Sequence, residues 1–526
     1  GEKVQQPVHP HTTFLDLKTR RQNENKKPHT QLSIQSEVGG ILQHRKKNGT
    51  IKRNKTKSHN HSGSHQPQRP GPLLTPRFLG SPLSLFQLFF SPAVVRTIID
   101  NTNINAARRL RAGKKFVWKV LTVRDFYIFM AILFFSSLVS VHHRSDYWRK
   151  AWPYNFPFPG NKMARNCFEA ILWSLHLSNP EEDEDNERKK NTADYDRLFK
   201  IKPLYTEIVT ACQAHFQPYQ MISIDERMVA SKARHRMKQY QKDKPTKWGY
   251  KLFVLADSST GYTWNFFVYT GKSVSTTGQG LSYSSVMDLL PLSSLGYTLF
   301  VDNFYTSPTL FQDLSARNIG CCGTIRKNRI GFPQTDKNDL PKKAERGDLR
   351  WLRRGNLLFV KWMDTREATM CPTVYAAFSA GVWQSKSIPA PDPVIDYNQN
   401  MGGVDLSDAL IGYYSVHHKS LKWYKTFFYH FMDIATVNSF ILYKELFKLR
   451  KEPASTGTPN PKKFKEQLVN TMELMPHSPR SRAGFPRVKT PIYCRKFQVP
   501  LCLTSTRNCF REWHDLNTDS YTLMTT

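Results

Sequence analysis

The sequence Tyr-Thr-Leu-Phe-Val-Asp-Asn-Phe-Tyr-Thr-Ser, residues 297–307, is the stretch around which the fold is predicted. Its first half is rich in β-branched and aromatic residues, which favours a strand, and turn-forming residues follow directly after Asp302. Residues 299–301 are apolar without alternation, as expected for a strand buried on both faces inside a sheet. We therefore expect Asp302 to be held rigidly at the end of an inner strand, where a metal-binding acid is useful.

Two further aspartates have comparable settings. Asp225 ends the segment Met-Ile-Ser-Ile-Asp, and Asp405 follows Gly-Gly-Val before a predicted helix. Three such carboxylates suit a two-metal phosphoryl-transfer site, because Mg²⁺ (or Mn²⁺) prefers oxygen ligands and completes its shell with water and phosphate. Each aspartate taken singly has another explanation, as a turn or helix-capping residue.

The acids beside this trio are given lesser roles. Asp408 is predicted to support the site, because it shares a helix face with Asp405, or else to be a first-turn acid favoured by the helix dipole. Glu226 points to the opposite side of the strand from Asp225, which favours a surface salt bridge over a metal ligand.

The charge of the chain indicates its partner. Lys and Arg outnumber Asp and Glu by 76 to 42, a formal net charge of +34, and nucleic acid is the first polyanion to consider. The alternative is a basic chain kept soluble by repulsion. The eight cysteines lack disulfide-scaffold spacing, which favours a reducing compartment. The apolar run 126–141 is too short for a membrane span, so we expect a buried core helix and no membrane partner.

Composition and periodicity divide the chain into segments. Residues 1–82 are predicted to be a disordered basic tail, whose clusters at 45–47 and 52–55 are typical of a nuclear signal or of unspecific DNA contacts. Residues 83–220 are predicted to form a helical domain for DNA binding and dimerisation, with the acidic run 181–187 as a solvated loop. The remaining segments are the first part of an α/β core (221–332), a β-rich insertion (333–396), the second part of the core (397–452), a linker (453–485) and a degenerate cysteine-rich tail (486–526).

The order of elements in the core predicts its architecture. Strands at 251–256 and 262–269 are joined by a hairpin turn, and the strand before Asp302 is followed by a helix from Pro308 and another strand at 319–325. This order is that of an RNase H-like sheet with mixed strand directions. The predicted fold class is therefore α/β, with an RNase H-like mixed-sheet core, a helical N-terminal domain, a β-rich insertion and a disordered N-terminal tail.

A basic segment at residues 232–251 alternates cations with aromatic rings. Such a segment is typical of a surface that binds phosphates and stacks on bases, and the alternative is a solvated loop. The predicted DNA contacts in it are Arg234, Lys238, Lys244, Lys247 and Lys251.

Six motifs together resemble the piggyBac transposase superfamily. They are Ile-Asp-Glu at 224–226, Lys-Pro-x-Lys-x-Gly-Tyr-Lys at 244–251, Val-Asp-Asn-Phe-Tyr-Thr-Ser at 301–307, Gly-Thr-Ile-Arg-Lys-Asn-Arg at 323–329, Met-Gly-Gly-Val-Asp-Leu-Ser-Asp at 401–408 and Lys-Trp-Tyr-Lys at 422–425. Any one of them is weak, but all of them in this order, within residues 82–448, are specific. The resemblance implies a DDD-type, cut-and-paste DNA transposase that excises its element through hairpin ends and integrates at TTAA.

The resemblance also assigns roles by position. Asp225, Asp302 and Asp405 match the family's catalytic, metal-binding aspartates, and Asp408 matches a nearby fourth acid. The implied partners are double-stranded DNA, as element ends and TTAA target, and a second copy of the chain, in the nucleus.

Basic and aromatic positions are assigned in the same way. Arg326 and Arg329 match residues that contact target DNA, and Lys422 is expected to bind DNA next to Trp423. Trp423 is interpreted either as support for an unpaired base or as ordinary packing between helices.

The C-terminal tail departs from the family pattern of paired Cys-x-x-Cys ligands for two zinc ions. Cys494, Cys502, Cys509 and His514 could furnish one Zn²⁺ set, or the module has decayed and binds none. The damaged tail motivates an alternative function, a transposase-derived DNA-binding protein without cleavage activity. RNA hydrolysis of the RNase H type is a third possibility, but it leaves the basic aromatic segment without a purpose.

Overall fold

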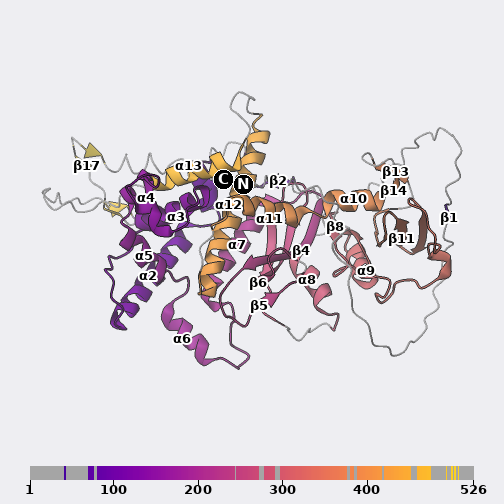
Figure 1. Cartoon of the computed structure of the whole chain (residues 1–526), viewed down its shortest axis with the longest axis horizontal. Helices are drawn as coiled ribbons and strands as arrows, with labels where there is room; N and C mark the ends of the chain where they lie inside the picture. The colour runs from indigo at the N-terminus through magenta and orange to yellow at the C-terminus, as the bar shows by residue number, and fades with distance from the viewer. Residues whose placement is uncertain are drawn as a thin grey trace, which may run out of the picture. The chain divides into compact units, whose positions relative to one another are not determined.

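The computed structural model describes residues 69–75, 80–242, 244–271, 278–290, 296–375, 380–383, 388–416, 420–451 and 459–474, together with two-residue strands in other segments (Figure 1). Contacts divide the chain into two units, residues 1–475 and 476–526. Within the described ranges, no helix is both long and apolar enough to cross a membrane. Most of the predicted N-terminal tail lies outside these ranges; Ile41–Leu42 forms the short strand β1, and Gly71–Pro72 forms β2, which pairs with β3 (Phe216–Gln217).

The first part of the chain is helical, as predicted. It contains α1 (Pro82–Gln87), α2 (Pro92–Arg111), α3 (Val123–Leu138), α4 (Pro157–Lys162), α5 (Arg165–Ser174), α6 (Pro180–Arg188) and α7 (Lys202–Ala214), with 3-10 turns at Arg144–Trp148 and Phe199–Ile201. Helix α2 begins where Ser91 accepts a hydrogen bond from the Val94 amide and Pro92 takes the first helical position. The predicted core helix is α3, which is buried from Phe126 to Phe134.

The acidic run at residues 181–187 forms most of helix α6, so the prediction of a loop was wrong. Asn179 caps the helix by accepting a hydrogen bond from the Glu181 amide, and Pro180 follows the cap. Three acids in the first turn interact favourably with the helix dipole. The cap and the dipole stabilise a helix here although the run has no apolar periodicity, which is why a loop was expected.

A single mixed sheet forms the core. Its strands are β4 (Met221–Ala230), β5 (Lys238–Tyr240), β6 (Trp248–Asp257), β7 (Thr263–Val268), β8 (Thr298–Val301) and β9 (Gly320–Gly323). They lie in the order β5-β6-β4-β8-β9, with β7 also paired to β6. Strand β4 is antiparallel to β6 and parallel to β8, and β8 is parallel to β9. This confirms the predicted mixed sheet with β8 inside it, and all four residues of β8 are buried.

Strand β4 differs from its prediction, because it continues for five residues beyond Asp225. The extension keeps pairing with β6, from Glu226 opposite Phe253 to Ala230 opposite Gly249. Asp225 therefore lies within a strand, whereas Asp302 directly follows one.

Helices cover the sheet. They are α8 (Leu281–Leu289), α9 (Pro308–Ala316), α10 (Asp392–Asn400), α11 (Gly403–Tyr413) and α12 (Trp423–Leu449). Helices α11 and α12 lie against β4 (Figure 1). Gly403 allows the close approach of α11, since a Cβ atom there would lie 2.5 Å from Ser223 Oγ.

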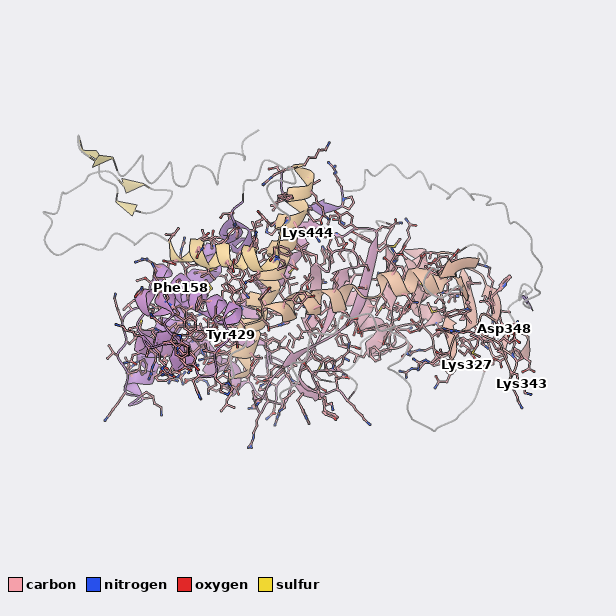
Figure 2. The ribbon with its side chains drawn as sticks, turned by 45° about the horizontal axis from the view of Figure 1, so that its top comes forward. Phe158, Lys327, Lys343, Asp348, Tyr429 and Lys444 are labelled. Carbon is pink, nitrogen blue, oxygen red and sulfur yellow. The ribbon has the colours of Figure 1, made fainter. Side chains whose placement is uncertain are left out.

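The insertion is β-rich, as predicted, and its main strands are β10 (Leu349–Arg354), β11 (Leu357–Met363) and β12 (Glu367–Met370), with a second pair, β13 (Ala380–Trp383) and β14 (Ile388–Pro391). Buried side chains of β10, β11 and β12, among them Leu349, Val360 and Met370, form one cluster with Phe300 of β8 and Cys322 of β9. The insertion therefore shares a core with the main sheet. Lys327, Lys343 and Asp348 mark this end of the ribbon (Figure 2).

Helix α13 (Pro461–Glu473) lies in the segment predicted as a linker. It packs against α3, α1 and α12, and it buries Phe464 and Leu468. Its amphipathic pattern was overlooked because Pro- and Lys-rich sequence surrounds it.

The second unit has two short antiparallel pairs in its described residues. They are β15 (Tyr493–Cys494) with β16 (Val499–Pro500), and β17 (Leu503–Thr504) with β18 (Arg507–Asn508). Cys502, Cys509 and His514 lie outside the described residues, so zinc binding by the tail stays a prediction.

Candidate active site

Asp225 and Asp302 are neighbours across two parallel strands. Ile224 of β4 is paired with Val301 of β8, and the next residue after each of them is an aspartate, Asp225 or Asp302. Neighbouring strands lie about 4.8 Å apart, and residues in register share a face of the sheet. Both aspartates are buried, with 4% and 9% of their surface exposed. The sheet thus brings two of the three predicted acids together.

The loop after Asp302 is built to hold that carboxylate. Asp302 Oδ1 accepts a hydrogen bond of 2.8 Å from the Phe304 amide. The Asp302 carbonyl accepts two more, from the Thr306 amide at 3.1 Å and from its hydroxyl at 2.9 Å. Helix α9 then begins at Pro308, as predicted, and Ser307 caps it.

A lysine lies directly at Asp225. Lys244 Nζ is 3.1 Å from Asp225 Oδ2 and 3.0 Å from the Glu226 carbonyl oxygen. Lys244 was predicted to contact DNA, and the structure shows that its ammonium also neutralises the acid of the site.

Glu226 lies on the opposite face of β4 from Asp225, as predicted, but it is buried rather than at the surface. Its Oε1 accepts hydrogen bonds from Lys251 Nζ at 3.2 Å and from the Tyr305 hydroxyl at 3.1 Å. Lys251 has 9% of its surface exposed and lies over the rings of Phe253 and Phe304. Lys251, which was predicted to contact DNA, is therefore buried in the structure and paired with Glu226.

The buried acids Asp225, Glu226 and Asp302 act on one another, although Lys244 and Lys251 offset part of their charge. Burial raises the pKa of Glu226, and the nearby charges of Asp225 and Asp302 raise it further. The pKa of Tyr397 on α10 is raised by burial and then by Asp302 and Asp225. Buried like charges favour a divalent cation that neutralises them, and two carboxylates plus substrate phosphate are an adequate ligand set for Mg²⁺. Asp225 and Asp302 therefore fit the predicted metal.

Asp405 lies in the first turn of α11 and is half-exposed. This turn packs beside the site, because Gly403 contacts Ser223, which shares a face of β4 with Asp225. In the part of the chain that the structure describes, however, no three acidic, histidine or cysteine side chains gather closely enough to hold one metal ion. Asp405 is thus on the adjacent helix without completing a three-ligand cluster.

Asp408 forms an ion pair with Arg227, the largest fully buried side chain of the structure. The same guanidinium donates a hydrogen bond of 2.8 Å to the Ser407 hydroxyl. Asp408 therefore anchors α11 to β4, which is a supporting role of a structural kind. Arg227 was missed from the sequence, although its position two residues after Asp225 places it on the same face.

Arg326 and Arg329 contact the loop after Asp302. Arg326 Nε donates to Asn303 Oδ1 at 3.1 Å, and Arg329 Nη2 donates to the carbonyl oxygens of Asn303 and Phe304 at 2.6 and 2.7 Å. Arg326 is exposed and Arg329 is half-buried. Both residues therefore lie beside the acid pair, where the sequence placed contacts to target DNA.

Trp423 begins α12 and packs on His235, with ring centroids 4.8 Å apart and planes 26° from parallel. It also meets Phe427 edge-on at 5.9 Å. One ring face is thus covered by protein, which supports the packing interpretation. Lys422, the residue before it, is exposed.

The basic aromatic segment forms the edge of the sheet. Tyr240 on β5 is paired with Trp248 on β6, their ring centroids are 4.8 Å apart, and both are about half exposed, at 51% and 54%. Lys238 Nζ lies over the Trp248 ring at 5.1 Å, and Arg234 and Lys247 are exposed. Cations and exposed rings together favour the nucleic-acid interpretation over a plain loop.

The comparisons with known proteins agree with this architecture. A family profile described as Transposase IS4 matches residues 81–440. Human PiggyBac transposable element-derived protein 3 is 28% identical over 380 residues, which are 69% of this chain and 61% of that protein. Human PiggyBac transposable element-derived protein 2 is 25% identical over 381 residues, or 69% of this chain and 62% of that protein. The match thus spans about three fifths of the length of these relatives.

A solved structure shares the fold. The cryo-EM structure of a piggyBac transposase synaptic complex with hairpin DNA matches with a TM-score of 0.68 and 23% identity, over 77% of this chain and 83% of that one. The chain belongs to the family described as Transposase IS4, whose profile spans more than half of it, so the protein is of the transposase type. The PiggyBac-derived relatives and the shared fold support its place in the piggyBac transposase superfamily.

Proposed function

We propose that this protein is a metal-dependent DNA transposase that cuts and joins DNA strands at TTAA sites. The single observation that carries the proposal is the pair of buried aspartates, Asp225 within β4 and Asp302 directly after β8, each one residue beyond the paired Ile224 and Val301. Supporting observations are the family match, the net charge of +34 and the exposed basic aromatic edge of the sheet.

In this proposal Asp225 and Asp302 hold Mg²⁺ or Mn²⁺, and Asp405 supplies a third carboxylate from α11. When bound, the metal would activate the attacking oxygen and stabilise the leaving oxygen of a phosphodiester. The protein contributes rigidity, since β4 and β8 fix the two acids and the Phe304 amide orients Asp302. A phosphodiester that enters the site would meet Lys244 beside Asp225 and Arg326 on the loop after Asp302.

The partners follow from the same surfaces. Double-stranded DNA is the proposed ligand, because exposed cations (Arg234, Lys247, Arg326 and Lys422) and half-exposed rings line the segments around the site. We further propose a homodimer that joins two element ends, and action in the nucleus. The synaptic DNA complex of the structural relative supports the DNA ligand.

The test is cleavage of an end-labelled element terminus by purified protein with Mg²⁺. Asp302→Asn and Asp225→Asn are expected to reduce nicking by more than about 100-fold, since loss of an outer-shell partner alone costs 10–100-fold at metal sites. Asp313→Asn is the matched control, because Asp313 pairs with Tyr283 on α8, outside the acid pair. Wild-type protein that cuts no better than Asp302→Asn would refute the proposal.

The second candidate is a transposase-derived DNA-binding protein that no longer cuts. It is favoured by the tail, which lacks the paired Cys-x-x-Cys ligands, and by Asp405, which does not join Asp225 and Asp302 in one ligand cluster in the described structure. Binding to many old element ends in chromatin, without excision products, would support this candidate over the first.

A further inference from the structure

Ile330 projects from the turn at residues 326–331 with 90% of its surface exposed. Single exposed aliphatic residues are common on proteins and need no explanation by themselves. The significance of Ile330 depends on how firmly the turn is held and on what lies beside it.

The turn is held firmly on both sides. Gly331 has φ of +83°, which suits glycine, and a Cβ atom there would lie 3.2 Å from Pro308 Cβ at the start of α9. Phe332, the next residue, is buried with its ring centroid 5.5 Å from that of Phe359. Ile330 is therefore a fixed projection rather than part of a loose loop.

The turn is also bonded to the loop that carries Asp302. Arg329 donates to the Phe304 carbonyl oxygen at 2.7 Å, and the Phe304 amide donates to Asp302 Oδ1 at 2.8 Å. Arg326 donates to Asn303 in the same loop. The projection and the acid pair are consequently parts of one connected unit.

The charges around Ile330 favour a polyanion as the partner. Arg326 and Arg329 precede it in the same turn, and among the described residues neither forms a salt bridge, whereas Lys327 Nζ is 2.8 Å from Glu367. Proteins that separate stacked base pairs combine such cations, which contact the DNA, with an apolar side chain that enters the base stack.

We propose that Ile330 is a wedge that enters the base stack of duplex DNA beside Asp302. The inference rests on the proposed function, and it names the base step that the wedge enters. Pyrimidine–purine steps such as TA unstack most easily, and the proposed target TTAA has TA at its centre. Insertion would kink the duplex by on the order of 20–90° and present the opened step to the acid pair.

The experiment uses the full chain without divalent cations, so that no strand is cut. A duplex carries 2-aminopurine beside a central TA step, and its fluorescence rises when the step unstacks. The wild-type protein and Ile330→Met are expected to raise the fluorescence, because both side chains are apolar and long. Ile330→Ser is expected to lose most of the rise and to bind the TA duplex roughly tenfold more weakly, because it no longer buries the aliphatic side chain.

Val117→Ser is the matched control, since Val117 is 89% exposed on the segment between α2 and α3. It is expected to behave as the wild type.

An equal fluorescence rise with Ile330→Ser, or no rise with saturating wild-type protein, would overturn the wedge. If the protein nicks DNA but does not unstack the TA step, the wedge is refuted and the proposed function stands. If it unstacks the TA step but never nicks DNA, the proposed cleavage is refuted and the wedge stands. Ile330→Ser that loses binding to a second protein but unstacks DNA normally would identify a protein-docking residue and also overturn the wedge.

Discussion

Lys244 Nζ lies 3.1 Å from Asp225 Oδ2, so a cation of the protein itself pairs with the acid that is proposed to bind metal. The lysine side chain is 22% exposed, whereas that of Asp225 is 5% exposed. The ammonium can therefore swing toward solvent, but the carboxylate cannot follow it. A metal ion bound as proposed would compete with Lys244 for this carboxylate oxygen.

Replacing Lys244 with Met should strengthen Mn²⁺ binding to the free protein by roughly two- to fivefold, the equivalent of one partly exposed ion pair. Titration calorimetry measures the affinity. Lys247→Met is the control, because Lys247 is an exposed residue of the same loop and should leave the affinity unchanged. Weaker Mn²⁺ binding in Lys244→Met would show that the lysine assists the metal rather than competing with it.

Loss of the buried Arg227 should destabilise the protein more than loss of its acidic partner. Arg227→Met is expected to cost on the order of 3–5 kcal/mol, because breaking a buried pair leaves polar groups without their partner. Asp408→Asn should cost less, about 1–3 kcal/mol, since the amide oxygen can still accept a hydrogen bond from Arg227 while the buried guanidinium loses its counter-charge. Urea unfolding measures both values. Equal effects of the two changes would contradict the anchoring role assigned to this pair.

The contact between α6 and the end of α5 should depend on pH. Burial by itself would raise the pKa of Asp183, but hydrogen bonds from His176 at 2.6 Å and Ser178 at 2.6 Å lower it below the usual value. The folded state therefore favours the carboxylate, and this stabilisation is present above the unfolded pKa of about 3.9 and is lost as pH falls.

Asp183→Asn should accordingly cost roughly 1–3 kcal/mol at pH 7, and the difference from wild type should shrink below about pH 4. Urea unfolding at several pH values gives the comparison. Asp185→Asn on the same helix is the control, because Asp185 forms an exposed pair with Arg188 and should change stability by less than about 1 kcal/mol. A constant difference across pH would argue against a charge effect.

Lys425 should make the stability rise with pH on the alkaline side. Burial lowers its pKa to about 7, and its Nζ donates to the carbonyl oxygens of Leu172 at 2.6 Å and Trp173 at 3.1 Å. The unfolded lysine titrates near pH 10.4, so between pH 7 and pH 10.4 the unfolded state binds more protons than the folded state. The free energy of unfolding therefore rises as pH rises through this range.

The expected gain between pH 7 and pH 9 is on the order of 2 kcal/mol, and Lys425→Met should abolish this slope. Lys422→Met, at an exposed neighbouring position, should keep it. Thermal unfolding in matched buffers measures the slope. A slope that persists in Lys425→Met would assign it to another group.

The inner strand and its acid were predictable because their signals are local. A short apolar run, an aspartate and turn residues follow one another at 297–307, and the structure has β8 and its loop there. The helix cap at Ser307 is equally local. The side on which Asp225 lies could also be predicted, because alternation along β4 fixes it.

Other parts of the site depend on contacts between distant segments. The continuation of β4 past Asp225 depends on pairing with β6, and the burial of Glu226 depends on Tyr305, 79 residues further along the chain. The position of Tyr397 near the acid pair could not be predicted from the sequence, because it follows from the packing of α10 against β4 and β9. Helix α6 was a different case, because its cap at Asn179 and Pro180 is a local signal, but the lack of apolar residues in the acidic run was given more weight.

The shared cluster of the insertion with Phe300 and Cys322 has an evolutionary consequence. Loss of the insertion by deletion or alternative splicing would remove the cover of β8, the strand directly before Asp302, and would destabilise the whole sheet. Relatives of this chain are therefore expected to change the proposed activity by point substitutions at the acids, while both parts of the core and the insertion between them are kept.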